Sequence, residues 1–82
     1  MNLYLLTQGE EIGYDTYDSV VVAAKSEDEA RKIHPNEWLD DPWNRKYGVD
    51  WCRTPEGVTV KLIGEAVKGT QSGVILSSFN AG

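Results

Sequence analysis

Large apolar residues gather in two segments near the start of the chain, and each segment predicts a strand. Residues 2–7 (NLYLLT) end at a Gln8-Gly9 turn and carry apolar side chains on both faces, which is typical of a central strand covered on both sides. Residues 19–24 (SVVVAA) contain consecutive β-branched residues, which favour a strand over a helix. We expect the two strands to pair antiparallel across a long loop that ends at Asp18.

A helix start follows the second strand. Ser26 and Glu29 have the spacing of a capping box, in which each side chain accepts a backbone N–H at the start of the helix. Acidic residues at 27–29 also suit the positive end of a helix. Pro35 disfavours helical angles at His34, so we expect a helix of about two turns. A helix this short depends on packing against the sheet.

The last third of the chain predicts two more strands. Residues 58–66 alternate apolar Val58, Val60 and Leu62 with polar neighbours, which predicts a half-buried strand with one wet face. A polar turn with two glycines follows at 68–73, and residues 74–79 (VILSSF) form the last predicted strand. We expect these two strands to form a closing hairpin.

The chain is long enough for one domain. With 82 residues and 9.1 kDa it has no room for a second core, so we predict a single domain over residues 1–82. The order β-β-α-β-β predicts an α+β fold: a four-stranded, mainly antiparallel sheet, with one short helix packed on one face and an aromatic-rich irregular excursion. The pattern leaves the order of strands in the sheet open.

The apolar segments are too short for a membrane span, which needs about 20 residues. Residues 1–7 have neither the basic residues nor the longer apolar region of a secretory signal. We therefore expect a cytoplasmic protein without membrane contact.

The charge of the chain is negative and unevenly spread. The net charge of −5 argues against direct binding of nucleic acid, whose phosphates it would repel. Residues 1–56 hold twelve acids and six bases, whereas residues 57–82 hold one acid and two bases. The expected loop over residues 8–18 holds only acidic charges, at Glu10, Glu11, Asp15 and Asp18. The first explanation of this loop is the ordinary surface charge of a small domain; the alternative is a patch that binds a partner protein with a basic surface.

Residues 36–57 show no regular period but are rich in rings, which predicts an ordered excursion. Four of the eight aromatic residues lie there within fourteen positions: Trp38, Trp43, Tyr47 and Trp51. Trp, Tyr and Arg dominate binding hot spots. We assign Trp38 and Trp51 to a lid over the sheet, with an interface as the alternative, and Trp43 to the interface. The candidate partner-binding residues are Glu10, Glu11, Tyr14, Asp15, Tyr17, Asp40, Asp41, Trp43, Arg45 and Tyr47.

The sequence offers little for catalysis. His34 fits a cap at the end of the helix, and Cys52 fits a packed thiol, since no further ligands lie at metal spacing. The adjacent acids at 10–11 and 40–41 would point to opposite sides of an extended chain. Phosphate-loop, dinucleotide and nucleophile-elbow motifs are absent. We predict no catalytic residue, cofactor or metal, and therefore no enzyme.

Three segments of the chain resemble short hypothetical proteins encoded by phages and by bacterial genomes that carry mobile elements. They are MNLYLLTQ, YDTYDSVVVAAKSEDEARKIHP, and IGEA with the later GVILSSFNAG. In general type, a small acidic α+β domain without a catalytic set is also similar to phage-encoded inhibitors of bacterial defence such as anti-CRISPR proteins. The resemblance implies a phage origin and a host cytoplasm as the location, and it transfers no functional residue.

Our leading hypothesis is a non-enzymatic binding protein that docks on a host defence protein and inhibits it. One alternative is a sponge or sensor that stacks a nucleotide-like small molecule on its tryptophans. Another is a structural or assembly domain that forms a homodimer through an exposed sheet edge.

Overall fold

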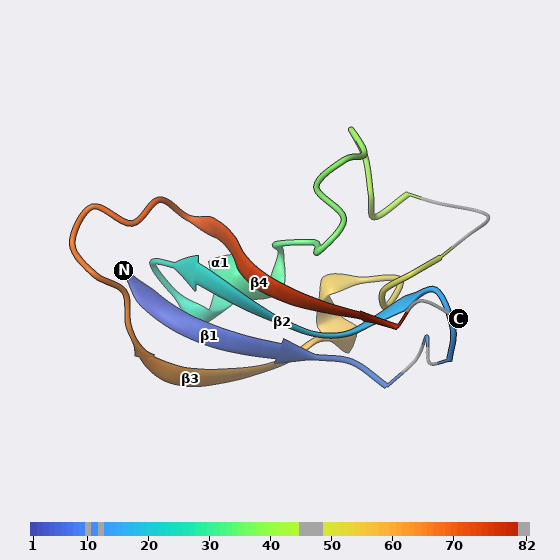
Figure 1. The fold of residues 1–82 in the computed structure, drawn as a ribbon, viewed down its shortest axis with the longest axis horizontal. Helices are drawn as coiled ribbons and strands as arrows, with labels where there is room; N and C mark the ends of the chain where they lie inside the picture. The colour runs from blue at the N-terminus through green and yellow to red at the C-terminus, as the bar shows by residue number, and fades with distance from the viewer. Residues whose placement is uncertain (10, 12, 45–48, 81–82) are drawn as a thin grey trace.

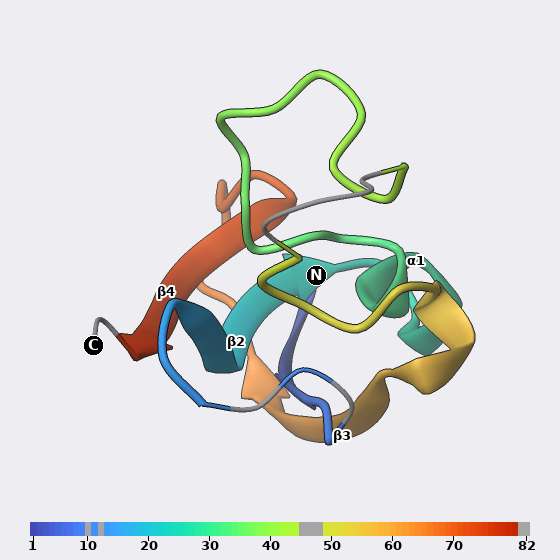
Figure 2. The same cartoon turned by 90° about the vertical axis from the view of Figure 1, so that its right-hand side faces the viewer.

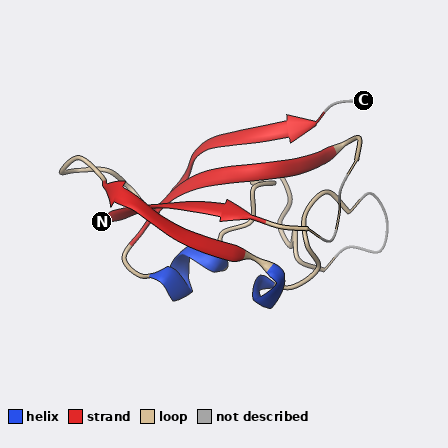
Figure 3. Ribbon diagram, turned by 90° about the horizontal axis from the view of Figure 1, so that it is seen from below, coloured by secondary structure: helices blue, strands red, loops and turns tan. Residues whose placement is uncertain are grey.

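A computed structural model describes residues 1–9, 11, 13–44 and 49–80 (Figure 1). The sheet order is β3-β1-β2-β4, and every neighbouring pair is antiparallel. The one α-helix and a short 3-10 helix lie on the same face of the sheet (Figure 3). The predicted α+β class, with a four-stranded antiparallel sheet and one short helix, is confirmed. The elements are β1 (Asn2–Thr7), β2 (Thr16–Ala24), α1 (Glu27–Arg31), η1 (Pro55–Gly57), β3 (Thr59–Glu65) and β4 (Gly73–Asn80).

The strand order corrects the expected closing hairpin. β3 pairs with β1 and β4 pairs with β2, so the two last strands lie at opposite edges of the sheet. The two most apolar strands, β1 and β2, take the centre, where each has a neighbour on both sides. The connection over residues 66–72 passes the end of the sheet instead of making a tight turn (Figure 1). Its reach of about 3.3 Å per residue is enough to cross three strand spacings of about 4.8 Å.

The core lies between one face of the sheet and α1. On that face Tyr4 pairs with Val22 and Leu6 pairs with Val20, and all four side chains are buried. Leu3 and Leu5 point to the opposite face and are only half-buried. The expectation that the first strand is central is confirmed, but its expected cover on both sides is wrong. Both described helices lie on the core face (Figure 3).

The edge strand β3 is more exposed than predicted. Val58 is buried just before the strand begins, but Leu62 is 59% exposed although it lies opposite Tyr4. The pairing jumps from Leu62 to Gly64, which makes Ile63 a bulge residue. The predicted burial of Leu62 is wrong, because a helix of five residues covers only part of the sheet.

Side chains at both ends of α1 fix its place. Ser26 accepts the Glu29 N–H at 3.1 Å, as the capping box predicts, while Glu29 itself accepts the Lys25 N–H at 3.3 Å. The helix is shorter than two turns and ends at Arg31, with Lys32 as its C-cap. Arg31 Nη1 donates to the carbonyls of Pro55 at 3.3 Å and Val58 at 2.9 Å. These bonds hold α1 against the segment that leads into β3.

Candidate functional site

Residues 36–44, which we call the Trp38 loop, extend away from the sheet after α1 (Figure 2). Hydrogen bonds fix the base of this loop. Asn36 Nδ2 donates to Asp50 Oδ2 at 2.9 Å, and Asn36 Oδ1 accepts the Trp38 N–H at 3.2 Å. Glu37 Oε1 accepts the Val74 N–H at 3.3 Å, which joins the loop to the start of β4. The loop is therefore held at two points of the scaffold.

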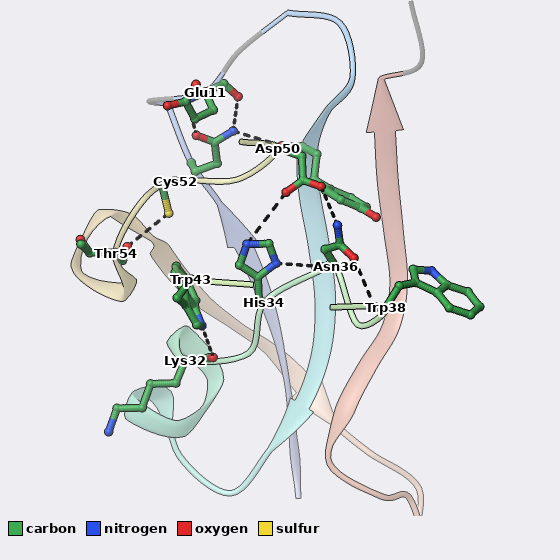
Figure 4. A network of polar contacts seen from close by, with 11 residues as sticks. Glu11, Lys32, His34, Asn36, Trp38, Trp43, Asp50, Cys52 and Thr54 are labelled. Carbon is green, nitrogen blue, oxygen red and sulfur yellow. Dashed lines mark hydrogen bonds and ion pairs between the residues drawn. The ribbon is translucent and has the colours of Figure 1, made fainter. Parts of the chain in front are cut away.

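The side chain of Trp38 points away from the rest of the molecule, past β4 (Figure 4). It is 93% exposed, and its neighbour Leu39 is 38% exposed. Assigning Trp38 to a lid is therefore wrong. The carboxylates of the Trp38 loop, Glu37, Asp40 and Asp41, belong to exposed residues. The loop presents a large apolar ring among negative charges.

The other two tryptophans face inward. Trp51 is fully buried beside Cys52, so the core-side assignment of Trp51 and the packed thiol are both confirmed. Trp43 is half-buried, and its Nε1 donates to the Lys32 carbonyl at 3.1 Å. The Trp43 ring also meets the His34 ring edge-on, with 4.8 Å between centroids. Trp43 thus ties the far end of the Trp38 loop to the helix end.

A buried polar network lies beneath the loop (Figure 4). His34 Nδ1 accepts the Asn36 N–H at 2.9 Å, and His34 Nε2 lies 4.0 Å from Asp50 Oδ1. In the neutral ring this leaves the proton on Nε2, facing the carboxylate. The Asp50 carbonyl accepts the Tyr17 N–H at 2.8 Å, which connects the network to β2. Sequence reasoning missed Asn36 and Asp50, because nothing in the local pattern indicates that residues fourteen positions apart bond to each other.

A small cavity of about 30 Å³ adjoins this network, with lining residues that include Trp43, Trp51 and Cys52. A buried water needs about 10–15 Å³ of such space, so the cavity has room for about two water molecules. The indole N–H of Trp51 is buried without a hydrogen-bond partner among the described residues. The cavity is far too small for a nucleotide-like ligand.

In the acidic loop ahead of β2, Arg53 compensates the charge of Glu11, and Asp15 has a strained backbone conformation. Gln8 Oε1 accepts the Glu11 N–H at 2.8 Å, and Glu11 Oε1 lies 3.6 Å from Arg53 Nε. Tyr14 is 77% exposed, and the exposed Asp15 has φ 59°, a left-handed conformation that Asp tolerates better than most residues. Tyr17 is not in the loop as expected, because β2 begins at Thr16. The Tyr17 ring packs on Phe79 of β4, with 4.8 Å between centroids.

The acidic loop and the Trp38 loop, which hold most of the described predicted site residues, lie apart in the fold (Figure 2). Among the described residues, no hydrogen bond or ion pair joins Tyr14 or Asp15 to Asp40 or Asp41. Three of the predicted residues lie outside the described part of the chain: Glu10, Arg45 and Tyr47. The partner-binding role of the predicted set stays a prediction.

The environment of Tyr17 makes its protonation depend on folding. Burial, followed by the negative charges of Asp50 and Glu37, raises the pKa of Tyr17 above its ordinary value of 10.0. The folded state therefore favours the neutral phenol of Tyr17, and this preference stabilises the fold. The stabilisation is fully present at pH values below the pKa that Tyr17 has in the unfolded chain. As the pH rises above 10.0, the unfolded state ionises first and the free energy of unfolding falls.

We expect the Tyr17→Phe variant to lose less stability than the wild type as the pH rises from 8 into the range above about 10. Urea unfolding of both proteins across this range measures the difference, and the other titrating groups cancel because they are common to both. Curves that fall in parallel would contradict the proposed environment of Tyr17.

Within residues 1–9, 11, 13–44 and 49–80, no three His, Cys, Asp or Glu side chains are grouped so that they could hold a metal ion. None of the helices in this part of the chain has the length and apolar character to cross a bilayer. The chain matches no protein-family model, no curated protein and no solved structure. The interpretation of its surface therefore rests on its own geometry.

Proposed function

We propose that this chain is a non-enzymatic binding protein that docks on a partner protein through the Trp38 loop. The observation that carries this proposal is the 93% exposure of Trp38 on a loop whose base is hydrogen-bonded. Tryptophan is enriched at binding hot spots because a rigid ring buries a large area at a small entropy cost. A loop that is already held in place loses less entropy on binding than a mobile one.

The chemistry of the loop favours a partner with an apolar pocket bordered by basic side chains. Trp38 and Leu39 supply the apolar contact, and Asp40 and Asp41 supply exposed negative charge beside it. The net charge of −5 acts in the same direction over longer distances. Such charge speeds association and makes it depend on salt more than it raises the affinity.

The biological setting in this proposal is inhibition of a host defence protein in the host cytoplasm, by a protein of phage origin. The resemblance of the segments at 1–8, 14–35, and 63–66 with 73–82 to phage-type proteins supports this setting. An inhibitor that occupies a site needs no catalytic group. The cavity of about 30 Å³ is too small to hold a nucleotide-like ligand, so it gives no support to that alternative.

Capture of partners from bacterial lysate, followed by titration of the captured protein, tests the proposal. We expect Trp38→Ala to raise the dissociation constant of the complex with the partner about 30-fold or more, since a hot-spot residue contributes about 2 kcal/mol or more to the binding free energy. Tyr14→Ala is the matched control, because Tyr14 is also a highly exposed ring but lies outside the Trp38 loop.

The control should bind like the wild type. Equal affinity of Trp38→Ala and the wild type would overturn the role of the loop. The absence of any stoichiometric partner for the wild type would overturn the function itself.

A further inference from the structure

The two edge strands of the sheet differ in their protection against pairing with another strand. β3 carries Lys61 and Glu65 and is interrupted by its bulge. β4 (GVILSSFN) contains no charge and no proline; its pairing with β2 shifts register at Ile75 and again at Asp18 of β2, and the residues Leu76–Ser78 between the two shifts pair regularly. Charged residues, prolines and bulges are the devices by which natural proteins keep an edge from pairing. β4 has neither a charged residue nor a proline along its whole length.

The exposed side chains of β4 are apolar and large. Ile75 is 51%, Leu76 68% and Phe79 45% exposed. Among the described strands, β4 has a neighbour on one side only. At its start, Glu37 already accepts the Val74 N–H, so the edge that is open to a further strand runs from Ile75 to the end of β4.

We propose that this edge pairs antiparallel with the same edge of a second copy of the chain, which joins two four-stranded sheets into one. A two-fold axis through Ser77, the midpoint of Ile75 and Phe79, makes the contact self-complementary. In this register Ile75 lies opposite Phe79 of the second copy, and Leu76 lies opposite Ser78. One apolar pair, Ile75 with Phe79, then meets at each end of the contact, and aromatic pairs with β-branched residues of this kind stabilise paired strands.

The charge distribution favours a second copy at this edge over any other part of the chain. Each copy has a net charge of −5, so two copies repel each other on average. β4 itself holds no charged residue, whereas Lys61 and Glu65 lie on β3, at the opposite edge of the sheet. Contact through β4 therefore sets no like charges of the two strands opposite each other.

The size of the contact sets its strength. At about 200 Å² for a large side chain, the exposed parts of Ile75, Leu76 and Phe79 offer about 300 Å² per chain, to which the strand backbone adds. A standard interface buries about 800 Å² per partner. The proposed dimer is therefore reversible and depends on protein concentration.

Sedimentation equilibrium from micromolar to millimolar concentration tests the proposal with the purified chain. We expect the mean mass of the wild type to rise from 9.1 kDa toward twice that value. Leu76→Lys puts two like charges near the two-fold axis and should weaken dimerisation about tenfold or more. Leu62→Lys on β3 is the matched control, since Leu62 is 59% exposed on the other edge, and it should dimerise like the wild type.

Hydrogen exchange tests the same contact at individual backbone amides. The amides from Ile75 to Phe79 should exchange more slowly at high concentration in the wild type but not in Leu76→Lys. Circular dichroism checks that each variant is folded, and Ser78→Lys on the same edge replaces Leu76→Lys if that variant is not. A wild type that stays at 9.1 kDa up to millimolar concentration would overturn the proposal, as would equal dimerisation of the β4 and β3 variants. None of these variants touches the Trp38 loop, so the result is independent of the proposed function.

Discussion

Replacing Trp51 with alanine is expected to lower the free energy of unfolding by about 3–5 kcal/mol, the usual cost of removing a large buried ring. Trp51 is fully buried and belongs to the same core cluster as Leu6, Val20 and Cys52. A domain of this size has a total stability of about 4–12 kcal/mol. The loss is therefore about a quarter or more of the total stability, and at the lower end of this range it is enough to unfold the domain at room temperature. Urea unfolding, followed by far-ultraviolet circular dichroism, measures the change.

Trp38→Ala is the matched control for this prediction. The residue type and the substitution are the same, but the Trp38 side chain is 93% exposed. We expect its free energy of unfolding to stay within about 0.5 kcal/mol of the wild type. If both variants lost equal stability, the assignment of one ring to the core and the other to the surface would be wrong.

Asp50→Ala is expected to cost about 2 kcal/mol of stability, because it removes a buried acceptor and leaves its donors without a replacement. Asp50 is 7% exposed, accepts from Asn36 Nδ2 at 2.9 Å and faces His34 Nε2 at 4.0 Å. Without the carboxylate, the Asn36 amide loses its bond and the base of the Trp38 loop loses one of its two anchors.

The exposed Asp40 provides the control for Asp50. Asp40→Ala removes the same carboxylate from the surface of the Trp38 loop and should change stability by no more than about 0.5 kcal/mol. Urea unfolding of both variants at neutral pH makes the comparison. An equal effect of the two substitutions would show that Asp50 does not stabilise the base of the loop.

Local patterns in the sequence were enough to predict the strands and the helix start. The β-branched run at 19–24 and the spacing of Ser26 and Glu29 act over a few residues, so one sequence shows them directly. The true start of β2 was missed because Asp18, an exposed extra residue at a register shift, interrupts the alternation after Tyr17. A bulge hides a strand from any argument that counts every second residue.

Strand order and the fate of each tryptophan depend on contacts that sequence distance conceals. The expected hairpin between the last two strands failed because β3 and β4 each pair with a strand from the start of the chain. Trp38 and Trp51 are the same residue type in the same irregular segment, yet one is exposed and one is buried. The residues directly before them do not distinguish the two, since Trp38 follows Glu37 and Trp51 follows Asp50.

The central position of β1 and β2 has a consequence for how the chain folds during synthesis. The pairing of β1 with β2 needs only residues 2–24, but β3 and β4 join them from residues 59–80. Until residues 59–80 have left the ribosome, the two most apolar strands can form only a hairpin with both edges open. Non-local pairing of this kind slows folding, and a lone two-stranded hairpin is marginally stable in water. The nascent chain therefore completes its sheet only when residues 59–80 have emerged.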